Sequence, residues 1–233
     1  MARLRRLLPH GTGRSGPLRR SHATLSPVHP MRRTSSSAVV LCAFALWLAA
    51  FVGPAAADDV AGRFDFYVLS LSWSPSYCAA EGERADPDQC ATGRPYAFVV
   101  HGLWPQYDRG YPEHCAADRR GPDRDLIASM LDIMPSRRLI RHEWTKHGTC
   151  SGLSPRRYFD LTRAAYGKVA IPPRLKRLEQ AIVVDPNVLE KAFLTLNEGL
   201  TADAIAVTCR GNRIREVRIC MTRDLSGFRS CPE

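Results

Sequence analysis

His142 and His147 stand five residues apart in the segment HEWTKHGTC, which opens with the H-E-x-x signature of a zinc peptidase helix. In such a peptidase the second histidine follows the first by four residues, so the two rings lie about 40° apart around the helix. Here Lys146 occupies that position, and His142 and His147 are about 140° apart. Because one metal ion fits poorly between rings so far apart, and no C-x-x-C pair offers another zinc site, we expect no metal or other cofactor.

The same segment has the components of acid–base chemistry at a phosphorus centre. Glu143 and His147 lie one helical turn apart, so we expect the carboxylate to orient the imidazole and to raise its pKa. Lys146 lies one turn from His142 and adds a fixed positive charge that favours an anion. A proton carrier, a carboxylate and a cation are thus grouped together. The alternative interpretation is a solvated helix face with two incidental histidines.

A further histidine, His101, directly follows the β-rich run YAFVV and opens the segment HGLWP. Taken alone, His101 could be a buried core residue and Trp104 could serve packing. Together, HGLWP and HEWTKHGTC resemble the two histidine elements of the ribonuclease T2 family. LSLSWSPSYC, MPSRRLIRHEW and VTCRGNRIREVRIC resemble that family's first strand, the lead-in to its second element and its C-terminal sheet, so the resemblance covers roughly residues 64–231.

The resemblance implies a metal-independent endonuclease that cleaves single-stranded RNA by transesterification through a 2′,3′-cyclic phosphate, with low to moderate base specificity. His147 would be the general base that takes the proton from the 2′-hydroxyl, and His101 the general acid that protonates the departing 5′-oxygen. His142 would bind phosphate, while Glu143 and Lys146 would stabilise the charge on phosphorus. The need for a 2′-hydroxyl implies RNA and excludes DNA. A non-catalytic secreted RNA-binding or signalling protein on the same fold is the alternative, which the intact set of catalytic residues disfavours.

The resemblance also suggests which residues contact bases. Trp104 stands where the family stacks a base, although packing in the core is its alternative role. Gln106 stands where many members have an acidic residue, so a purine preference does not carry over. The full set of candidate base-binding residues is Trp104, Gln106, Tyr107, Tyr111, Pro135 and Ser136.

Residues 1–57 do not have the composition of a folded domain, since they carry eight Arg and no acidic residue. A basic start at Met31, an apolar run over 38–52 and an A-x-A site ending at Ala57 predict a signal peptide over 31–57. Residues 1–30 would be a basic extension or a mis-assigned start. An uncleaved membrane anchor and a weak twin-arginine signal are the alternatives. We therefore expect a protein exported to the periplasm or secreted, without stable membrane association.

Segment 58–233 has a length that suits one well-cored catalytic domain. It holds 25 Lys and Arg against 23 Asp and Glu, so little of the chain's net charge of +10 belongs to it. Bulk charge therefore gives little support for nucleic-acid binding, and any polyanion site must be a local cluster. We expect a monomer.

Cysteine usage agrees with export. Of the eight cysteines, Cys42 lies in the leader and seven follow it, of which an oxidising compartment should pair six. We predict Cys78–Cys90, Cys115–Cys150 and Cys209–Cys220, with Cys231 unpaired, although the sequence alone permits other pairings.

The elements that must position these residues can also be read from the sequence. Residues 63–75 alternate as a strand buried on both faces, and 204–222 as a hairpin around Gly211-Asn212. Loops are expected over 79–95 and 106–122. Apolar spacing predicts helices, in chain order, over 123–134, 137–148, 154–168 and 185–199. Strands and helices do not alternate strictly, which predicts an α+β domain with a mainly antiparallel sheet flanked by several helices and stapled by disulfides.

Overall fold

The computed structural model describes residues 59–232 except 92, 94–95, 116–119 and 179–181. The predictions for 1–30 and 31–57 lie outside these residues. The described residues lie in one compact unit. No helix within the described residues is long and apolar enough to cross a bilayer.

Four strands form one antiparallel sheet in the order β2-β1-β4-β3, which confirms the predicted fold class. The strands are β1 (Phe66–Trp73), β2 (Phe98–Gln106), β3 (Ile205–Arg210) and β4 (Arg213–Thr222). The helices are α2 (Ser74–Glu81), α3 (Pro87–Cys90), α4 (Arg124–Met130), α5 (Arg137–Lys146), α6 (Pro155–Gly167) and α7 (Pro186–Leu196).

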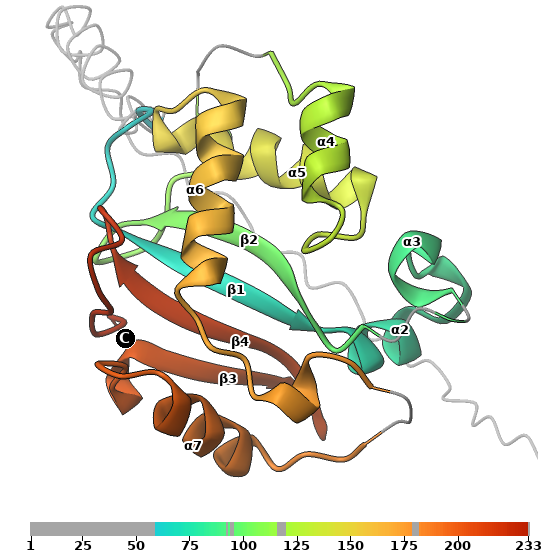
Figure 1. The fold of residues 1–233 in the computed structure, drawn as a ribbon. Helices are drawn as coiled ribbons and strands as arrows, with labels where there is room; N and C mark the ends of the chain where they lie inside the picture. The colour runs from blue at the N-terminus through green and yellow to red at the C-terminus, as the bar shows by residue number, and fades with distance from the viewer. Residues whose placement is uncertain (1–58, 92, 94–95, 116–119, 179–181, 233) are drawn as a thin grey trace, which may run out of the picture. The chain divides into compact units, whose positions relative to one another are not determined.

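The main hydrophobic core lies on one face of the sheet. Leu69 and Leu71 of β1 point into it, together with apolar residues of α4, α5, α6 and α7. Figure 1 shows α6 crossing β1 and β2 while α7 runs beside β3. On the opposite face, Phe66 and Val68 form a small second cluster. The two-faced burial predicted for this strand is therefore confirmed.

The helix boundaries follow their capping residues. Ser154 and Asp185 cap α6 and α7 with their side chains, and each is followed by Pro at the first helical position, as predicted. The helix predicted over 137–148 begins at Arg137 as expected but ends two residues early, at Lys146, and a short 3-10 helix, Gly148–Ser151, continues the chain. Gly148 is needed for space instead, since a Cβ there would lie 2.5 Å from the Trp144 ring.

The segment that follows β1 is more helical than predicted. The predicted strand over 63–75 ends at Trp73, and α2 begins at Ser74 with Pro at its start. The predicted loop over 79–95 contains the end of α2 and the four-residue α3, which Asp86 caps. The bond between Cys78 and Cys90 joins the two helices, so a short polar stretch without its own core is held by a covalent link.

Two β-bulges interrupt the sheet where functional side chains emerge. Ser70 pairs with Gly102 and Leu71 with Val100, so His101 is skipped in the register of β1 with β2. A bulge shifts the alternation of side chains by one residue, so that residues three apart along the strand can face the same side of the sheet. Val100 and Leu103 accordingly both enter the main core, while His101 is only partly buried. The sequence placed His101 directly after a strand, whereas β2 continues through it to Gln106.

The second bulge is in β4. Thr208 pairs with Glu216 and Cys209 with Ile214, so Arg215 has no partner in the register with β3. Ile214 and Val217 are both buried in the main core. The intervening Arg215 is exposed and Glu216 is buried outside that core.

The structure confirms two of the three predicted disulfides and corrects the third. Cys78–Cys90 and Cys115–Cys150 are present, but Cys220 pairs with Cys231, so the predicted Cys209–Cys220 bond is wrong. Cys209 lies near the turn of the β3–β4 hairpin, opposite Ile214, roughly 20 Å along the strand from Cys220. The C-terminal segment folds back against β4, where Arg229 N donates to Cys220 O at 3.1 Å, and brings Cys231 within bonding distance. Cys209 is free and exposed.

Candidate active site

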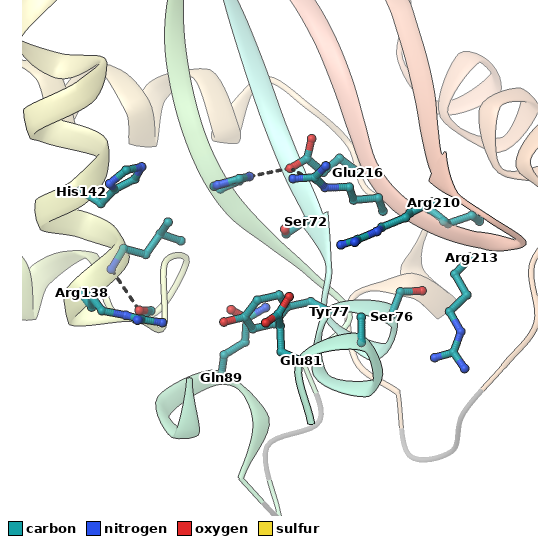
Figure 2. A pocket seen from close by; sticks show the side chains of 16 residues that line it. Ser72, Ser76, Tyr77, Glu81, Gln89, Arg138, His142, Arg210, Arg213 and Glu216 are labelled. Carbon is teal, nitrogen blue, oxygen red and sulfur yellow. Dashed lines mark hydrogen bonds and ion pairs between the residues drawn. The ribbon is translucent and has the colours of Figure 1, made fainter. Parts of the chain in front are cut away.

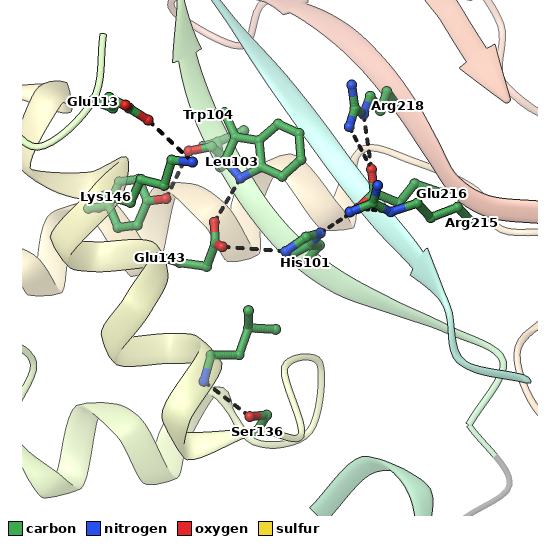
Figure 3. A network of polar contacts seen from close by, with 12 residues as sticks. His101, Leu103, Trp104, Glu113, Ser136, Glu143, Lys146, Arg215, Glu216 and Arg218 are labelled. Carbon is green, nitrogen blue, oxygen red and sulfur yellow. Dashed lines mark hydrogen bonds and ion pairs between the residues drawn. The ribbon is translucent and has the colours of Figure 1, made fainter. Parts of the chain in front are cut away.

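A buried carboxylate from α5 connects the two histidine elements. Trp104 Nε1 donates a hydrogen bond of 2.7 Å to Glu143 Oε2, and Glu143 Oε1 lies 3.6 Å from His101 Nε2. The Glu143 side chain is 1% exposed. Figure 3 shows these contacts as one chain of polar groups that passes from the helix to the edge strand β2. Packing of α5 beside β2 thus turns two separate sequence motifs into one site.

Gly102 makes this approach possible. A Cβ at this position would lie 2.5 Å from Trp104 Nε1 and closer still to the carboxylate of Glu143. Such contacts are shorter than real Cβ atoms tolerate, so any side chain would push Glu143 away from Trp104. The glycine of the HGLWP segment is therefore required by close packing.

His101 has a second carboxylate partner, Glu216 of β4, which the sequence analysis did not identify. His101 Nδ1 lies 2.6 Å from Glu216 Oε1. Because an ionised carboxylate only accepts, Nδ1 carries the proton and Nε2 faces Glu143. Glu216 is 1% exposed, and Arg218 donates to its other oxygen from Nε at 3.0 Å and from Nη2 at 2.9 Å.

The sheet provides room for the contact between His101 and Glu216, which lie on strands separated by β1. The β1 residues between them are small: Ser72 pairs with both Val99 and Glu216, and Ser70 pairs with Gly102. Two strand spacings amount to about 10 Å, a gap that a histidine and a glutamate can bridge only over short side chains. The alternating serines of LSLSW were the one signal in the sequence for this bridge.

The charges around His101 set its protonation. Burial alone would lower the pKa of His101, but the hydrogen bond to Glu216 and the charges of Glu143 and Glu216 raise it above its ordinary value. Burial also opposes ionisation of Glu216, yet the hydrogen bond and charge of His101, with Arg218, bring its pKa down to about 2. Burial raises the pKa of Glu143 to about 7, against the opposing effect of His101. At neutral pH, Glu216 is the permanently ionised partner of His101.

His147 has the opposite environment. It is 6% exposed, its ring stacks on Trp104 with centroids 5.2 Å apart, and its Nδ1 has no hydrogen-bond partner within the described part of the chain. Burial, with the nearby charge of Lys146, lowers the pKa of His147 to about 3. The expectation that Glu143 orients His147 and raises its pKa is wrong, because Glu143 is held by Trp104 and His101. His147 also follows the last residue of α5, at φ −113°, outside regular helical geometry.

The two other basic residues of the HEWTKHGTC segment, Lys146 and His142, line a cavity together with His101 and His147. Lys146 Nζ lies 3.2 Å from Glu113 Oε2 and 5.9 Å from the centre of the Tyr111 ring. The bond between Cys115 and Cys150 ties the loop that carries Tyr111 and Glu113 to the short 3-10 helix that follows α5. His142 is exposed at the cavity, and its pKa is lowered by partial burial and by Lys146.

The structure brings together the five predicted catalytic residues and part of the predicted base-binding set. One cavity is lined by His101, Trp104, Gln106, Tyr111, His142, Glu143, Lys146, His147, Arg215, Glu216 and Arg218. Three groups already lie beside the Trp104 ring: the rings of His101 and His147, each with its centroid 5.2 Å away, and the Arg218 guanidinium at 5.1 Å. Gln106 bends back to donate to its neighbour's carbonyl, Pro105 O, at 2.8 Å.

The other base-binding candidates lie elsewhere. Tyr107 does not line the cavity; its hydroxyl donates to Asp59 at 3.2 Å and its ring packs against the main core. Ser136 lines a second, adjoining cavity, where it caps α5 and donates to Asp86. Pro135 is buried and lines neither cavity.

No group of three or more His, Cys, Asp or Glu side chains among the described residues is arranged to hold a metal ion. His142 is exposed and His147 is buried beneath Trp104, so the two rings of the HEWTKHGTC segment do not converge. The carboxylate between them, Glu143, is committed to Trp104 and His101. The peptidase-like opening of this segment therefore belongs to a site of another kind.

Comparison with known proteins agrees with this arrangement. A ribonuclease from Aeromonas hydrophila is 48% identical over 119 residues, which cover 51% of this chain and 53% of that protein. A probable ribonuclease from Haemophilus influenzae is 33% identical over 120 residues, or 46% of this chain and 44% of that protein. The aligned region thus spans about half the length of these relatives. RNase NT, solved in complex with 5′-AMP, superposes with a TM-score of 0.56 at 28% identity, over 73% of this chain and 92% of its own.

A model of the whole family covers more of the chain than these pairwise alignments. The ribonuclease T2 family model matches residues 64–231, from the residues just before β1 to the last cysteine. Both histidine elements, the Glu216 strand and all three disulfides fall inside this match. This chain therefore belongs to the ribonuclease T2 family.

Proposed function

We propose that this protein is an endoribonuclease that cleaves single-stranded RNA by acid–base transesterification through a 2′,3′-cyclic phosphate, without a metal ion. The observation that carries the proposal is a single cavity in which two histidines lie in opposite electrostatic environments, His101 between two carboxylates and His147 buried near Lys146. His147 is neutral at pH 7 and can accept a proton, whereas the raised pKa of His101 favours the form that can donate one. Two titratable groups whose pKa values are moved apart are what acid–base catalysis requires.

Each histidine then has one task. His147 takes the proton from the ribose 2′-hydroxyl, whose oxygen attacks phosphorus. His101 gives a proton from Nε2 to the departing 5′-oxygen, while its Nδ1 stays bonded to Glu216. In-line displacement needs the two groups on opposite sides of phosphorus. The two histidines come from different elements, which favours such an arrangement: His101 stands at the bulge of β2 and His147 follows the end of α5. The Trp104 ring lies near both, with its centroid 5.2 Å from each imidazole.

The charge that builds on the phosphoryl oxygens needs donors at the same place. Lys146 supplies a fixed positive charge and His142 an exposed imidazole at the cavity. Glu143, whose pKa of about 7 lets it hold a proton near neutrality, can donate that proton to a phosphoryl oxygen. A DNA chain lacks the 2′-hydroxyl and would therefore not be cut. RNase NT binds 5′-AMP, which supports nucleotide recognition by this fold.

Trp104 and Tyr111 are proposed to contact a base at this cavity, and Ser136 a second base at the adjoining one. Gln106 would offer its amide to a base edge. We further propose that residues 31–57 direct export as a signal peptide, that the domain 58–233 acts as a monomer, and that the disulfides form outside the cytoplasm.

Product analysis on the sixteen dinucleoside monophosphates, with EDTA present, tests the proposal. We expect 2′,3′-cyclic phosphate ends and undiminished rates under chelation. His101→Phe, which keeps most of the ring volume, should abolish turnover while the melting temperature stays near that of the wild type. His114→Asn is the matched control, because His114 is exposed and lines neither cavity. Activity that disappears on chelation, or a His101→Phe variant that still cleaves, would rule the mechanism out.

A further inference from the structure

A second cavity, of about 400 Å3, adjoins the one that holds His147. His101, His142, Arg215 and Glu216 line both cavities, so the two meet at the His101 side of the site. Figure 2 shows the second cavity between α5, the α2–α3 segment and the end of the β3–β4 hairpin. The proposed reaction uses its inner end, while the role of its outer end is open.

The proposed reaction gives the second cavity a direction along the RNA. His147 and Trp104 line only the first cavity, which is therefore the side of the nucleotide that supplies the 2′-hydroxyl. His101 protonates the 5′-oxygen of the next nucleotide and stands where the cavities meet. The nucleotide that leaves must then extend into the second cavity, and its own 3′-oxygen points toward the outer end. This step rests on the proposed function.

Three arginines line that cavity without a carboxylate partner. Arg138, Arg210 and Arg213 are exposed and form no ion pair with any described residue. Two carboxylates also line the cavity: Glu216 is engaged by His101 and Arg218, and Glu81 by Arg84 at 4.0 Å. In Figure 2, Arg210 reaches into the cavity from the hairpin and Arg138 from the α5 side, with Arg213 further out. The outer end therefore keeps an excess of positive charge.

The hairpin adds a structural reason to regard this charge as functional. Arg210 and Arg213 are directly paired across the strands, next to the turn at Gly211 with φ 60°. Like charges directly opposite each other destabilise a sheet. A bound anion between the two guanidinium groups would remove that repulsion and form charge-assisted hydrogen bonds to both. Arg210 and Arg213 thus repel each other in the free protein, and a bound anion would turn that repulsion into a favourable interaction.

We propose that Arg210 and Arg213, with Arg138, form a phosphate subsite for the RNA chain on the 3′ side of the leaving nucleotide. The ligand is a phosphodiester or a 3′-terminal phosphate, one nucleotide beyond the bond that is cut. The enzyme would then prefer RNA that continues past the leaving nucleotide over a bare dinucleoside monophosphate.

The preference is measured with two matched substrates. The first is a dinucleoside monophosphate (NpN), and the second has the same bases with an added 3′-phosphate (NpNp). We expect kcat/KM for NpNp to be about ten-fold higher at low ionic strength, the size of one charge-assisted contact. The advantage should shrink as salt is added, since phosphate contacts on single strands depend on ionic strength.

Arg210→Ala with Arg213→Ala should bring the NpNp to NpN ratio close to one and leave NpN cleavage unchanged. Neither side chain touches the histidines or Glu216, so the basal reaction is preserved. Arg156→Ala with Arg157→Ala removes the same charge from the exposed start of α6, outside both cavities, and should keep the ratio. A wild-type ratio of one, a ratio retained by the hairpin variant, or an equal loss in the α6 variant would overturn the subsite.

A binding measurement separates this inference from the proposed function. The 2′-deoxy analogues of NpN and NpNp cannot be cleaved by this chemistry, and their affinities are measured by calorimetry. We expect the added 3′-phosphate to tighten binding about ten-fold in the wild type and not in the hairpin variant. If no RNA is cleaved but this difference persists, the proposed function fails and the phosphate subsite stands. If both analogues bind equally, the subsite fails whatever the activity.

Discussion

Replacing Glu216 by Gln tests whether the buried carboxylate behind His101 controls the general acid. The substitution preserves size, and the amide oxygen can still accept from Nδ1 of His101, so the 2.6 Å contact can be kept. Two things are lost: a negative charge that is 1% exposed and that raises the pKa of His101, and the acceptor for Arg218, because the amide nitrogen that replaces the other oxygen is a donor. Glu216→Gln therefore changes the electrostatics of the acid with little change in its position.

The magnitude follows from the kind of contact that is altered. A hydrogen bond to a charged group contributes about 1.5–3 kcal/mol, and 1.36 kcal/mol corresponds to one pH unit. The pKa of His101 should fall by roughly one to two pH units in the variant. Because the protonated form of His101 is the active one, its contribution is lost as pH rises through its pKa. The alkaline limb of the kcat/KM profile should move to lower pH by that amount, and activity should recover in acid.

The assay is kcat/KM for one dinucleoside monophosphate across pH, together with an NMR titration of His101. Glu216→Asp keeps the charge and should restore part of the shift. Glu81→Gln is the matched control, since it removes a carboxylate that lines the second cavity without contacting His101. The reasoning is refuted if the alkaline limb stays in place, if Glu81→Gln moves it equally, or if Glu216→Gln lowers activity by the same factor at every pH.

Three further predictions concern steric fit, pH and the free thiol. Gly102→Ala should lower activity at least ten-fold and stability by about 1–3 kcal/mol, because a Cβ would displace Glu143; melting and kcat/KM measurements with wild-type values would contradict it. The pH profile of wild-type kcat/KM should have its acidic limb below the ordinary histidine pKa of about 6.5, because burial lowers the pKa of His147 to about 3. Its alkaline limb should lie above that ordinary value, because the pKa of His101 is raised. A pH profile centred on a single pKa near 6.5 would refute this. Cys209→Ser should leave the melting temperature unchanged, since this cysteine is exposed and free; a loss of about 2–5 kcal/mol would show that it is paired.

The sequence alone determined the components of the site and the class of fold. The spacing of His142, Lys146 and His147 disfavoured a peptidase metal pair on angular grounds, and the two histidine elements together indicated the family. Caps at Ser154 and Asp185 located two helix starts, because capping is a local interaction that four or five residues specify. Cysteine positions gave the two disulfides that join neighbouring or motif-bearing segments.

Only the tertiary structure decided which groups meet. Glu216 lies 115 residues from His101 in sequence, and their contact depends on the order β2-β1-β4, on small serines between them and on a bulge in each outer strand of the trio. Helical periodicity predicted that Glu143 contacts His147. In the structure Glu143 instead contacts Trp104 and His101 of β2, the strand beside α5. Cys220 bonds to Cys231 rather than to Cys209 because the C-terminal segment folds back against β4. Local interactions are encoded in neighbouring residues, whereas register, bulges and chain return are set by the packing of the whole sheet.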